Sequence, residues 1–168
     1  MRVTDKYVFF WGGEFSQWYM IPILWNGVVY NCAEQAMMAS KAKLFKDDAA
    51  LENIMCAEHP KQQKQIGREI RNFNKGKWDA ICRQIVFDIN VAKFSIPELK
   101  SKMLEMGDRT FVEASPYDKI WGIGMKEEDR GVEDPANWKG TNWLGQCLTE
   151  VSRYLRSDQE ADFVLKWS

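Results

Sequence analysis

The sequence predicts a mainly helical α+β domain, and two observations lead to this prediction. Residues 7–30 combine aromatic and aliphatic runs with Gly and Asn turn residues, which is typical of short strands joined by turns. From residue 31 onward, the apolar residues recur mainly at intervals of three and four, the spacing of an amphipathic helix. A chain of 168 residues fits one domain with a sizeable core, so we expect a single domain over residues 1–168.

The strand region ends in a predicted β-hairpin near the N-terminus. Asn26 and Gly27 stand between the apolar runs ending in ILW and starting with VVY. An Asn-Gly pair favours a type I′ turn, because both central residues of that turn need a positive φ angle. We expect this short hairpin to lead the chain to Asn31.

The helical periodicity divides into five predicted helices. The first covers YNCAEQAMMASKAKLF, residues 30–45, with Asn31 as the N-cap residue. The second starts at Pro60 and continues through KQQKQIGREIRNF, and the third runs from about residue 78 to residue 94. The fourth covers residues 97–106 and ends before Gly107. The last covers residues 141–155 and turns five apolar residues inward: Leu144, Cys147, Leu148, Val151 and Leu155.

Two further segments differ from this helical pattern. TFVEAS, residues 110–115, predicts a short strand. Residues 121–143 show no periodicity, and long irregular segments inside compact domains usually have a function. We interpret this segment as a candidate lid or pocket wall.

The charge balance and the cysteine usage exclude several classes of protein. Twenty-three basic and 24 acidic residues leave a net charge of −1, so any nucleic-acid contact must be local. No stretch is long and apolar enough to span a membrane, and we expect a cytoplasmic protein without a membrane partner. The four cysteines lack CxxC spacing and predict reduced core thiols, while His59 is the only histidine. We therefore expect no metal site and no cofactor.

Glu34 and Lys41 are unusual because they are charged residues in an otherwise apolar helical segment. Seven residues correspond to nearly two helical turns, so both side chains should project from the same face, about 10 Å apart along the axis. Glu34 can alternatively form a capping box with Asn31, by reaching back to the Asn31 backbone N–H. Lys41 can alternatively be a solvated lysine at the rim of the apolar face.

A second candidate is Asp118 in the segment SPYDKIWGIG. The two glycines that flank Ile123 indicate a backbone that approaches another group closely or turns with an unusual φ angle. Asp118 stands at the entrance of this turn. An aspartate there commonly closes the turn itself, which is the alternative to a functional role.

A third candidate is the basic segment of residues 61–77. It contains six basic residues and one acidic residue, a net charge of +5. On a helix, Arg68 and Arg71 would share a face, and the planar guanidinium of arginine suits phosphate recognition. The alternative is a solvated helix face. The basic residues are Lys61, Lys64, Arg68, Arg71, Lys75 and Lys77.

Four blocks of the sequence resemble, in order, the NADAR family, also called YbiA-like. They are FFWGGEFSQWYMIPILWNGVVY, YNCAEQAMMASKAKLF, the segment from HPKQQKQIGREIRNF to KWDAICRQIVFDINVAKF, and YDKIWGIG followed by GTNWLGQCLTEVSRYL. The resemblance covers about residues 8–155 and implies a single YbiA-like domain. One departure is Gln17 in FSQWY, where many members have Asn.

The resemblance implies an N-glycosidase. Members of the family cleave phosphorylated riboflavin-pathway intermediates between base and ribose, or remove ADP-ribose from guanine bases in DNA. A phosphoribosyl or ADP-ribosyl small molecule is therefore the implied substrate, with ADP-ribosylated DNA as the other implied partner. The catalytic positions carry over to Glu34, Lys41 and Asp118. The substrate-binding positions carry over to Arg68, Trp78, Trp121, Gly122 and Asn142.

This activity accounts for charged residues in an apolar helix. An N-glycosidic bond breaks through an oxocarbenium-like transition state, which needs negative charge near the anomeric carbon and an acid or base. Glu34 and Asp118 are the natural pair for these roles. Lys41 either attacks the open-chain sugar aldehyde as a Schiff base or holds a ribose hydroxyl or carboxylate. Trp78 and Trp121 can stack against or enclose the base.

Two other classes of function compete with this interpretation. One is a non-catalytic module that binds ADP-ribose or another NAD derivative in the same pocket. A binding module has no need for Glu34, Lys41 and Asp118 together, which favours the enzyme. The other is a phosphate-binding structural partner, which only the charge of residues 61–77 supports.

Overall fold

The computed structural model describes the backbone of residues 1–167 and the side chains of residues 1–158. The chain falls into two compact units: unit 1 combines residues 1–16 with the part from residue 94 onward, and unit 2 is residues 17–93. Helices predominate beside two small sheets, which confirms the mainly helical α+β class.

Unit 2 begins with the predicted hairpin. Strands β3 (Ile23–Trp25) and β4 (Val28–Tyr30) pair in antiparallel register, with Leu24 opposite Val29. Asn26 and Gly27 have φ angles of 50° and 77°, as a type I′ turn requires. The hairpin prediction is confirmed.

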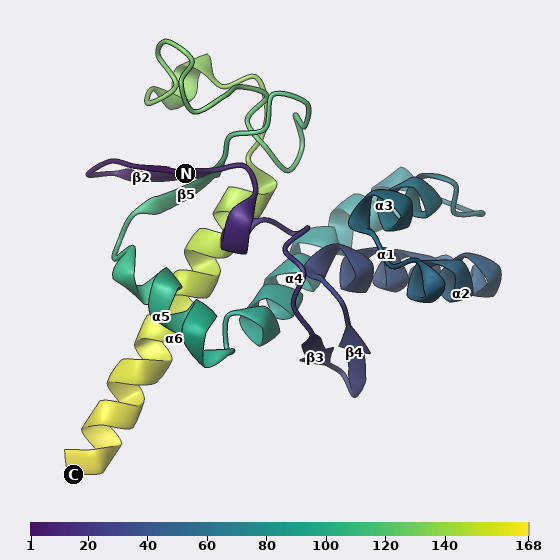
Figure 1. Ribbon diagram of the computed structural model, residues 1–168, viewed down its shortest axis with the longest axis horizontal. Coiled ribbons are helices and arrows are strands. Elements are labelled where there is room, and N and C mark those ends of the chain that lie inside the picture. The colour runs from purple at the N-terminus through teal and green to yellow at the C-terminus, as the bar shows by residue number, and fades with distance from the viewer. Residues whose placement is uncertain (168) are drawn as a thin grey trace. The chain divides into compact units, whose positions relative to one another are not determined.

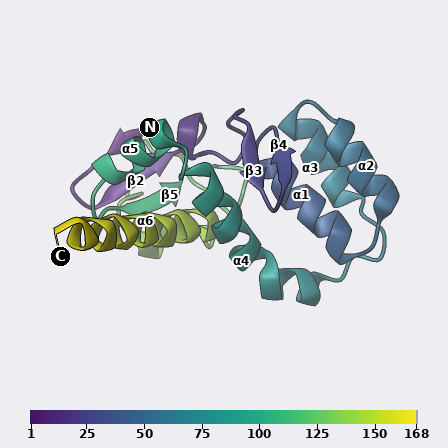
Figure 2. The same ribbon diagram turned by 90° about the horizontal axis from the view of Figure 1, so that it is seen from below.

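Four helices complete unit 2: α1 (Ala33–Leu44), α2 (Asp48–Cys56), α3 (Pro60–Arg68) and α4 (Lys75–Lys93). Helix α1 is central, because it contacts each of the other three, and Figures 1 and 2 both show α1, α2 and α3 side by side. Its central position explains why eight of its twelve residues are buried. The core of unit 2 is therefore built around α1.

The structure corrects the sequence prediction for unit 2 at two helices. Helix α2 was not predicted; Asp47 caps its N-terminus by accepting a hydrogen bond from the Ala50 backbone N–H at 3.1 Å. Helix α3 ends at Arg68, five residues before the predicted end. The physical reason is a competing partner, because the Arg71 backbone N–H donates to Asp47 Oδ2 at 2.8 Å.

Unit 1 contains a three-stranded sheet in the order β1-β2-β5. Strand β1 (Arg2–Val3) pairs antiparallel with β2 (Tyr7–Phe10), and β2 pairs parallel with β5 (Thr110–Glu113), as Figure 1 shows for β2 and β5. Helix α5 (Pro97–Glu105) and the long helix α6 (Trp143–Trp167) pack against each other, and α6 also contacts β5. The five inward residues predicted for the last helix are all buried. Two short 3-10 helices, η1 (Gly13–Phe15) and η2 (Pro135–Asn137), complete this unit.

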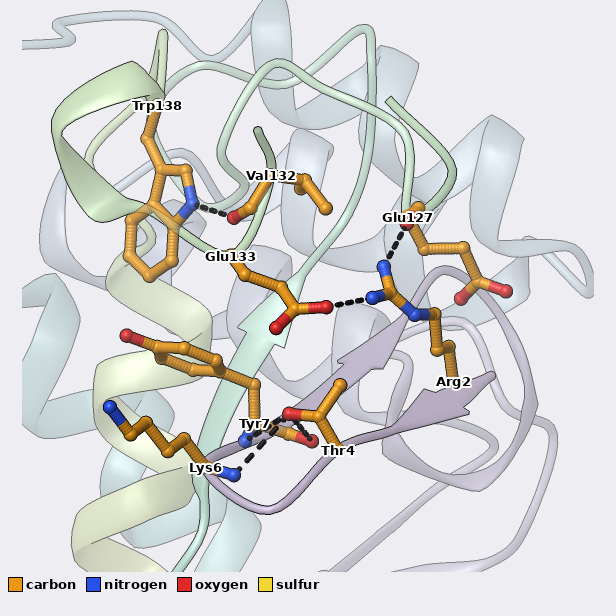
Figure 3. A network of polar contacts seen from close by, with 8 residues as sticks. All are labelled: Arg2, Thr4, Lys6, Tyr7, Glu127, Val132, Glu133 and Trp138. Carbon is orange, nitrogen blue, oxygen red and sulfur yellow. Dashed lines mark hydrogen bonds and ion pairs between the residues drawn. The ribbon is translucent and has the colours of Figure 1, made fainter. Parts of the chain in front are cut away.

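The irregular segment 121–143 packs into unit 1. Ile123, Met125 and Val132 belong to a buried cluster with Phe9 and Val112. Figure 3 shows two of the polar contacts that hold the segment: Trp138 Nε1 donates to the Val132 carbonyl at 2.7 Å, and Arg2 donates to the Glu127 carbonyl at 2.7 Å. Arg2 also forms an ion pair with Glu133. The inner side of this segment is therefore core, and its role as a lid or pocket wall stays a prediction.

Among the helices within residues 1–167, none has the length and apolar content needed to cross a membrane.

Candidate active site

Helix α1 places Glu34 in its buried first turn. The side chain of Glu34 is 6% exposed, and its backbone N–H donates to the Gln17 carbonyl at 2.9 Å. The predicted capping box with Asn31 is wrong. The helix begins at Ala33 with Cys32 as N-cap residue, so Gln35 rather than Glu34 reaches back, and its Oε1 accepts from the Asn31 backbone N–H at 2.8 Å.

Lys41 lies two turns further along α1, and three groups contact its ammonium. Its Nζ donates a hydrogen bond of 2.7 Å to the Gly67 carbonyl. The same atom lies 4.5 Å from the centre of the Phe73 ring and 5.7 Å from the centre of the Trp78 ring. A carbonyl and two aromatic faces all attract a cation. Lys41 is therefore held at a fixed place and is not a freely solvated lysine.

The Gly67 carbonyl is available to Lys41 because α3 ends one residue later. The last four carbonyls of a helix have no partner within the helix, and the C-terminal end of the helix favours a cation. Helix α1 can approach this point because residue 67 is a glycine: a Cβ atom there would overlap Sδ of Met38. Gly67 thus serves both the packing of α1 on α3 and the anchoring of Lys41.

Burial and two neighbouring charges act on the pKa of Lys41. Burial is the largest effect and lowers the pKa from its ordinary value. The Glu34 carboxylate raises this pKa, whereas the Arg68 guanidinium lowers it. The net direction is downward, which makes the neutral amine more accessible than in a free lysine.

Arg68 and Trp78 complete a cluster with Glu34 and Lys41 inside unit 2. Trp78, in the first turns of α4, is 7% exposed and forms one wall beside Lys41. Arg68, the last residue of α3, is exposed, and within residues 1–158 its side chain has no hydrogen bond or ion pair. Arg71 does not share its helical face, because it lies beyond the end of α3 and pairs with Asp47 at 3.1 Å.

The other predicted site residues lie in unit 1. Asp118 closes a turn, because its Oδ1 accepts from the backbone N–H groups of Ile120 at 2.9 Å and Trp121 at 2.8 Å. The Asp118 backbone N–H in turn donates to Ser115 Oγ at 3.2 Å. This geometry agrees with a turn residue and leaves its catalytic role a prediction.

Trp121, Gly122 and Asn142 lie around the same turn. The rings of Trp121 and Trp143 meet edge to face with centres 5.7 Å apart. A Cβ on Gly122 would come within 2.9 Å of the Asp118 and Glu113 carbonyls, so the close approach predicted for this glycine is to the chain's own backbone. Asn142 is buried: its Oδ1 accepts from the Glu113 N–H and its Nδ2 donates to the Phe111 carbonyl, both at 3.0 Å. Their roles in substrate binding stay predictions.

Sequence reasoning missed two contributors to the cluster in unit 2. The Gly67 carbonyl is a main-chain group, so no side chain marks it in the sequence. Only a correct prediction that α3 ends at Arg68 could have indicated that this carbonyl is open to another partner. The sequence places Phe73 at the end of the second predicted helix, whereas it lies in the loop after α3 and is 46% exposed. A surface hollow of unit 1 is a poorer candidate for a phosphorylated ligand, because four carboxylates line it, those of Glu127, Glu128, Asp129 and Glu133.

Comparison with known proteins identifies the class. The NADAR domain family model matches residues 9–156. The chain is 43% identical over 163 residues to an N-glycosidase of Acanthamoeba polyphaga mimivirus, covering 88% of this chain and 95% of that protein. It is 30% identical over 125 residues to an N-glycosidase of Nostoc punctiforme, covering 74% and 73%. The chain also resembles the solved structure of the Escherichia coli protein YbiA, with a TM-score of 0.76 and 24% identity over 94% of this chain and 89% of that one, a likeness of fold.

This chain belongs to the NADAR domain family. Its similarity to the two named N-glycosidases supports the hydrolysis of N-glycosyl compounds as its activity.

Proposed function

We propose that this protein hydrolyses the N-glycosidic bond between a phosphorylated ribose and a base, at the cluster of Glu34, Lys41, Arg68 and Trp78. The substrate is either a phosphoribosyl intermediate of riboflavin synthesis or an ADP-ribosyl group on guanine in DNA. The observation that carries the proposal is the position of Lys41 Nζ, held by the Gly67 carbonyl and two aromatic rings on the same helix as the buried Glu34.

Glu34 supplies the negative charge that the reaction needs. Positive charge develops at C1 of the ribose as the bond to the base breaks, and a nearby carboxylate stabilises it. Burial strengthens this interaction, since less water screens it. The same carboxylate can afterwards take a proton from the attacking water as a general base.

Lys41 is the proposed nucleophile. The ring opens as the ring oxygen takes the proton of the base nitrogen, which leaves C1 doubly bonded to that nitrogen. The neutral Lys41 amine attacks C1, both bonds from C1 to the base nitrogen break as the C1–Nζ double bond forms, and the two protons of Nζ pass to the departing nitrogen. Water then adds to C1 of the imine, the C1–Nζ bond breaks, and the sugar leaves as its aldehyde. The net reaction is hydrolysis, and Lys41 is restored. The lowered pKa of Lys41 supports this step because only the neutral amine is a nucleophile.

Arg68 and Trp78 are proposed to bind the substrate. Arg68 is exposed beside Lys41, and its planar guanidinium can pair with two phosphate oxygens. Trp78 offers an aromatic face beside the amine. A base can pack against this ring while the phosphate is held by Arg68.

A non-catalytic module that binds ADP-ribose is the second candidate, because the same cation and aromatic residues would also retain such a ligand. The deciding experiment incubates the protein separately with a phosphorylated ribosylamine of the riboflavin pathway and with DNA carrying ADP-ribosyl-guanine. Release of the free base from either substrate supports the enzyme and identifies its substrate class. Tight binding of both without base release would support the binding module instead.

A further inference from the structure

Two buried amide side chains, those of Gln17 and Asn90, connect α4 to the first turn of α1. Gln17 lies in the turn before β3 and is 7% exposed, and Asn90 lies on α4 and is 0% exposed. Asn90 Nδ2 donates a hydrogen bond of 2.9 Å to Gln17 Oε1. Both residues belong to unit 2, as Glu34 does, and the proposed hydrolysis assigns no role to either amide.

The first turn of α1 takes a cap from outside the helix. The first four N–H groups of a helix have no partner within the helix, and the N-cap side chain of Cys32 forms no capping hydrogen bond. The Gln17 carbonyl supplies an acceptor instead, because it accepts from the Glu34 N–H at 2.9 Å. The main chain of Gln17 therefore holds the residue that carries the proposed catalytic carboxylate.

The Val86 carbonyl fixes the orientation of both amides. Asn90 Nδ2 also donates to this carbonyl at 2.8 Å, and a carbonyl can only accept, so the nitrogen of Asn90 must face it. The atom of Gln17 that meets the same nitrogen is therefore the oxygen. Gln17 cannot turn its amide over without losing the hydrogen bond to α4.

The amide pair lowers the stability of the fold. Gln17 Nε2 and Asn90 Oδ1 are buried and have no hydrogen-bond partner in the part of the chain that the structure describes. A buried donor or acceptor without a partner destabilises a fold, whereas two apolar side chains of the same shape would need none. Such unpaired groups call for an explanation other than stability. Placement of the chain around Glu34 is that explanation.

We propose that Gln17 and Asn90 are positioning residues that hold Glu34 in place for catalysis. Asn90 holds the Gln17 side chain, and the Gln17 carbonyl holds the Glu34 N–H. The first turn of α1 is thereby fixed against α4, the helix that carries Trp78. A displacement of about 1 Å in a reacting group can lower a rate about 100-fold. The inference rests on the proposed catalytic role of Glu34, and neither amide needs to contact the substrate.

The test replaces both amides with apolar side chains of similar size, in the double variant Q17M/N90L. Chemical denaturation should show that this variant is at least as stable as the wild type, because it leaves no unpaired amide in the core. Each single variant, Q17M or N90L, removes a partner from the amide that remains. Each should therefore raise the equilibrium constant of unfolding about 5- to 150-fold.

Two further measurements report on Glu34 in the double variant. Its amide hydrogen should exchange about 2- to 10-fold faster by NMR, because the carbonyl that accepts from it is no longer held. The kcat should fall about 10- to 100-fold while KM stays close to the wild-type value, because Arg68 and Trp78 still bind the substrate. The substrate is the phosphorylated ribosylamine or the ADP-ribosylated DNA, whichever the wild type cleaves.

Ser152→Ala is the matched control. Ser152 lies on α6 in unit 1, and its Oγ is another buried atom without a hydrogen-bond partner among the described residues. This variant should be at least as stable as the wild type and should keep both the wild-type kcat and the wild-type exchange of the Glu34 amide. It separates the loss of an unpaired polar group from the loss of the connection to Glu34.

Three results would overturn the proposal. Unchanged exchange of the Glu34 amide in Q17M/N90L would mean that the pair does not hold α1. Faster exchange with a wild-type kcat would mean that the cap does not matter for catalysis. A double variant less stable than both single variants would assign the pair to the stability of the core. Failure of the wild type to release a base would instead refute the proposed hydrolysis, and the exchange and denaturation measurements, which need no turnover, distinguish the two failures.

Discussion

Lys41 Nζ and the Gly67 carbonyl are joined by a hydrogen bond of 2.7 Å that links α1 to the end of α3. The bond holds the amine at the point where the Phe73 and Trp78 rings also meet it. Such contacts favour the ammonium, whereas burial favours the neutral amine and determines the net lowering of the Lys41 pKa. The chemistry of the site depends on which form of Lys41 meets the substrate.

The first prediction is a covalent adduct on Lys41. Borohydride added during turnover should reduce the imine and fix the sugar to the protein, and peptide mass mapping should place the adduct on Lys41. Lys41→Arg should abolish the adduct and turnover, because a guanidinium stays protonated. The rate of imine formation should rise with pH through the Lys41 pKa, which lies below that of a free lysine.

Lys43→Arg is the matched control, because Lys43 is an exposed lysine on the same helix. It should keep both turnover and adduct. Normal turnover by Lys41→Arg, together with no adduct in the wild type, would instead make Lys41 an electrostatic or packing residue, with direct attack by water.

The second prediction concerns Glu34. Glu34→Gln should keep the fold, because the residue that reaches back to the helix start is Gln35, and should lower turnover about 10²- to 10⁴-fold, the usual contribution of a general acid or base. Steady-state rates measured beside thermal melting separate the two effects. Glu52→Gln, an exposed change on α2, should leave the rate unchanged. A Glu34→Gln protein with wild-type turnover would return this residue to a structural role.

Much of the fold could be predicted because its signals are local. The Asn-Gly turn and the apolar periodicities of α1, α4, α5 and α6 each follow from a short stretch of sequence. Helix α2 has only two buried residues, Ala50 and Ile54, so the apolar periodicity of its sequence is too weak to predict a helix. The end of α3 depends on Asp47, whose carboxylate accepts a hydrogen bond from the Arg71 backbone N–H. The two residues are 24 positions apart in the sequence, and no local pattern reveals such a partner.

The candidate site could be predicted only in part for the same reason. Side chains such as Glu34 and Lys41 stand out because a charge in an apolar helix is a visible anomaly. The Gly67 carbonyl is identical in chemistry to every other carbonyl and becomes a ligand only where α3 ends. Phe73 is the last residue predicted as helix, but the chain leaves the helix at Arg68 and Phe73 lies beside Lys41.

The third prediction tests the ion pair that ends α3. Hydrogen bonds from the Arg71 side chain and backbone, and from the Ala50 N–H, lower the pKa of Asp47 from 3.8 to about 2. A depressed carboxyl pKa stabilises the fold above the unfolded-state value, and this contribution disappears as pH falls from about 4 to about 2. Asp47→Asn should therefore lower the Tm at pH 7 and converge with wild type near pH 2. The neighbouring exposed Asp48→Asn is the control; a deficit that persists unchanged at low pH would assign the loss to packing.

The fourth prediction separates the two roles of Asp118. Asp118→Asn keeps an oxygen that can accept from Ile120 and Trp121, so the turn and the Tm should be preserved. If the carboxylate is catalytic, turnover should nevertheless fall about 10²-fold or more. Asp118→Ala removes both turn hydrogen bonds and should also lower the free energy of unfolding by about 1–2 kcal/mol. Unchanged turnover in Asp118→Asn would mark a turn residue.

The fifth prediction concerns the phosphate of the substrate. A charge-assisted pair between Arg68 and phosphate is worth about 1.5–3 kcal/mol, so Arg68→Ala should raise KM for the phosphorylated substrate by about 10- to 150-fold. The KM for the dephosphorylated analogue should change little, because the interaction that was lost is absent there. Arg71→Ala is the informative control: Arg71 pairs with Asp47, so its loss should lower the Tm and leave both KM values close to wild type. Equal increases of KM for the two substrates in Arg68→Ala would mean that Arg68 supports the end of α3 and does not bind phosphate.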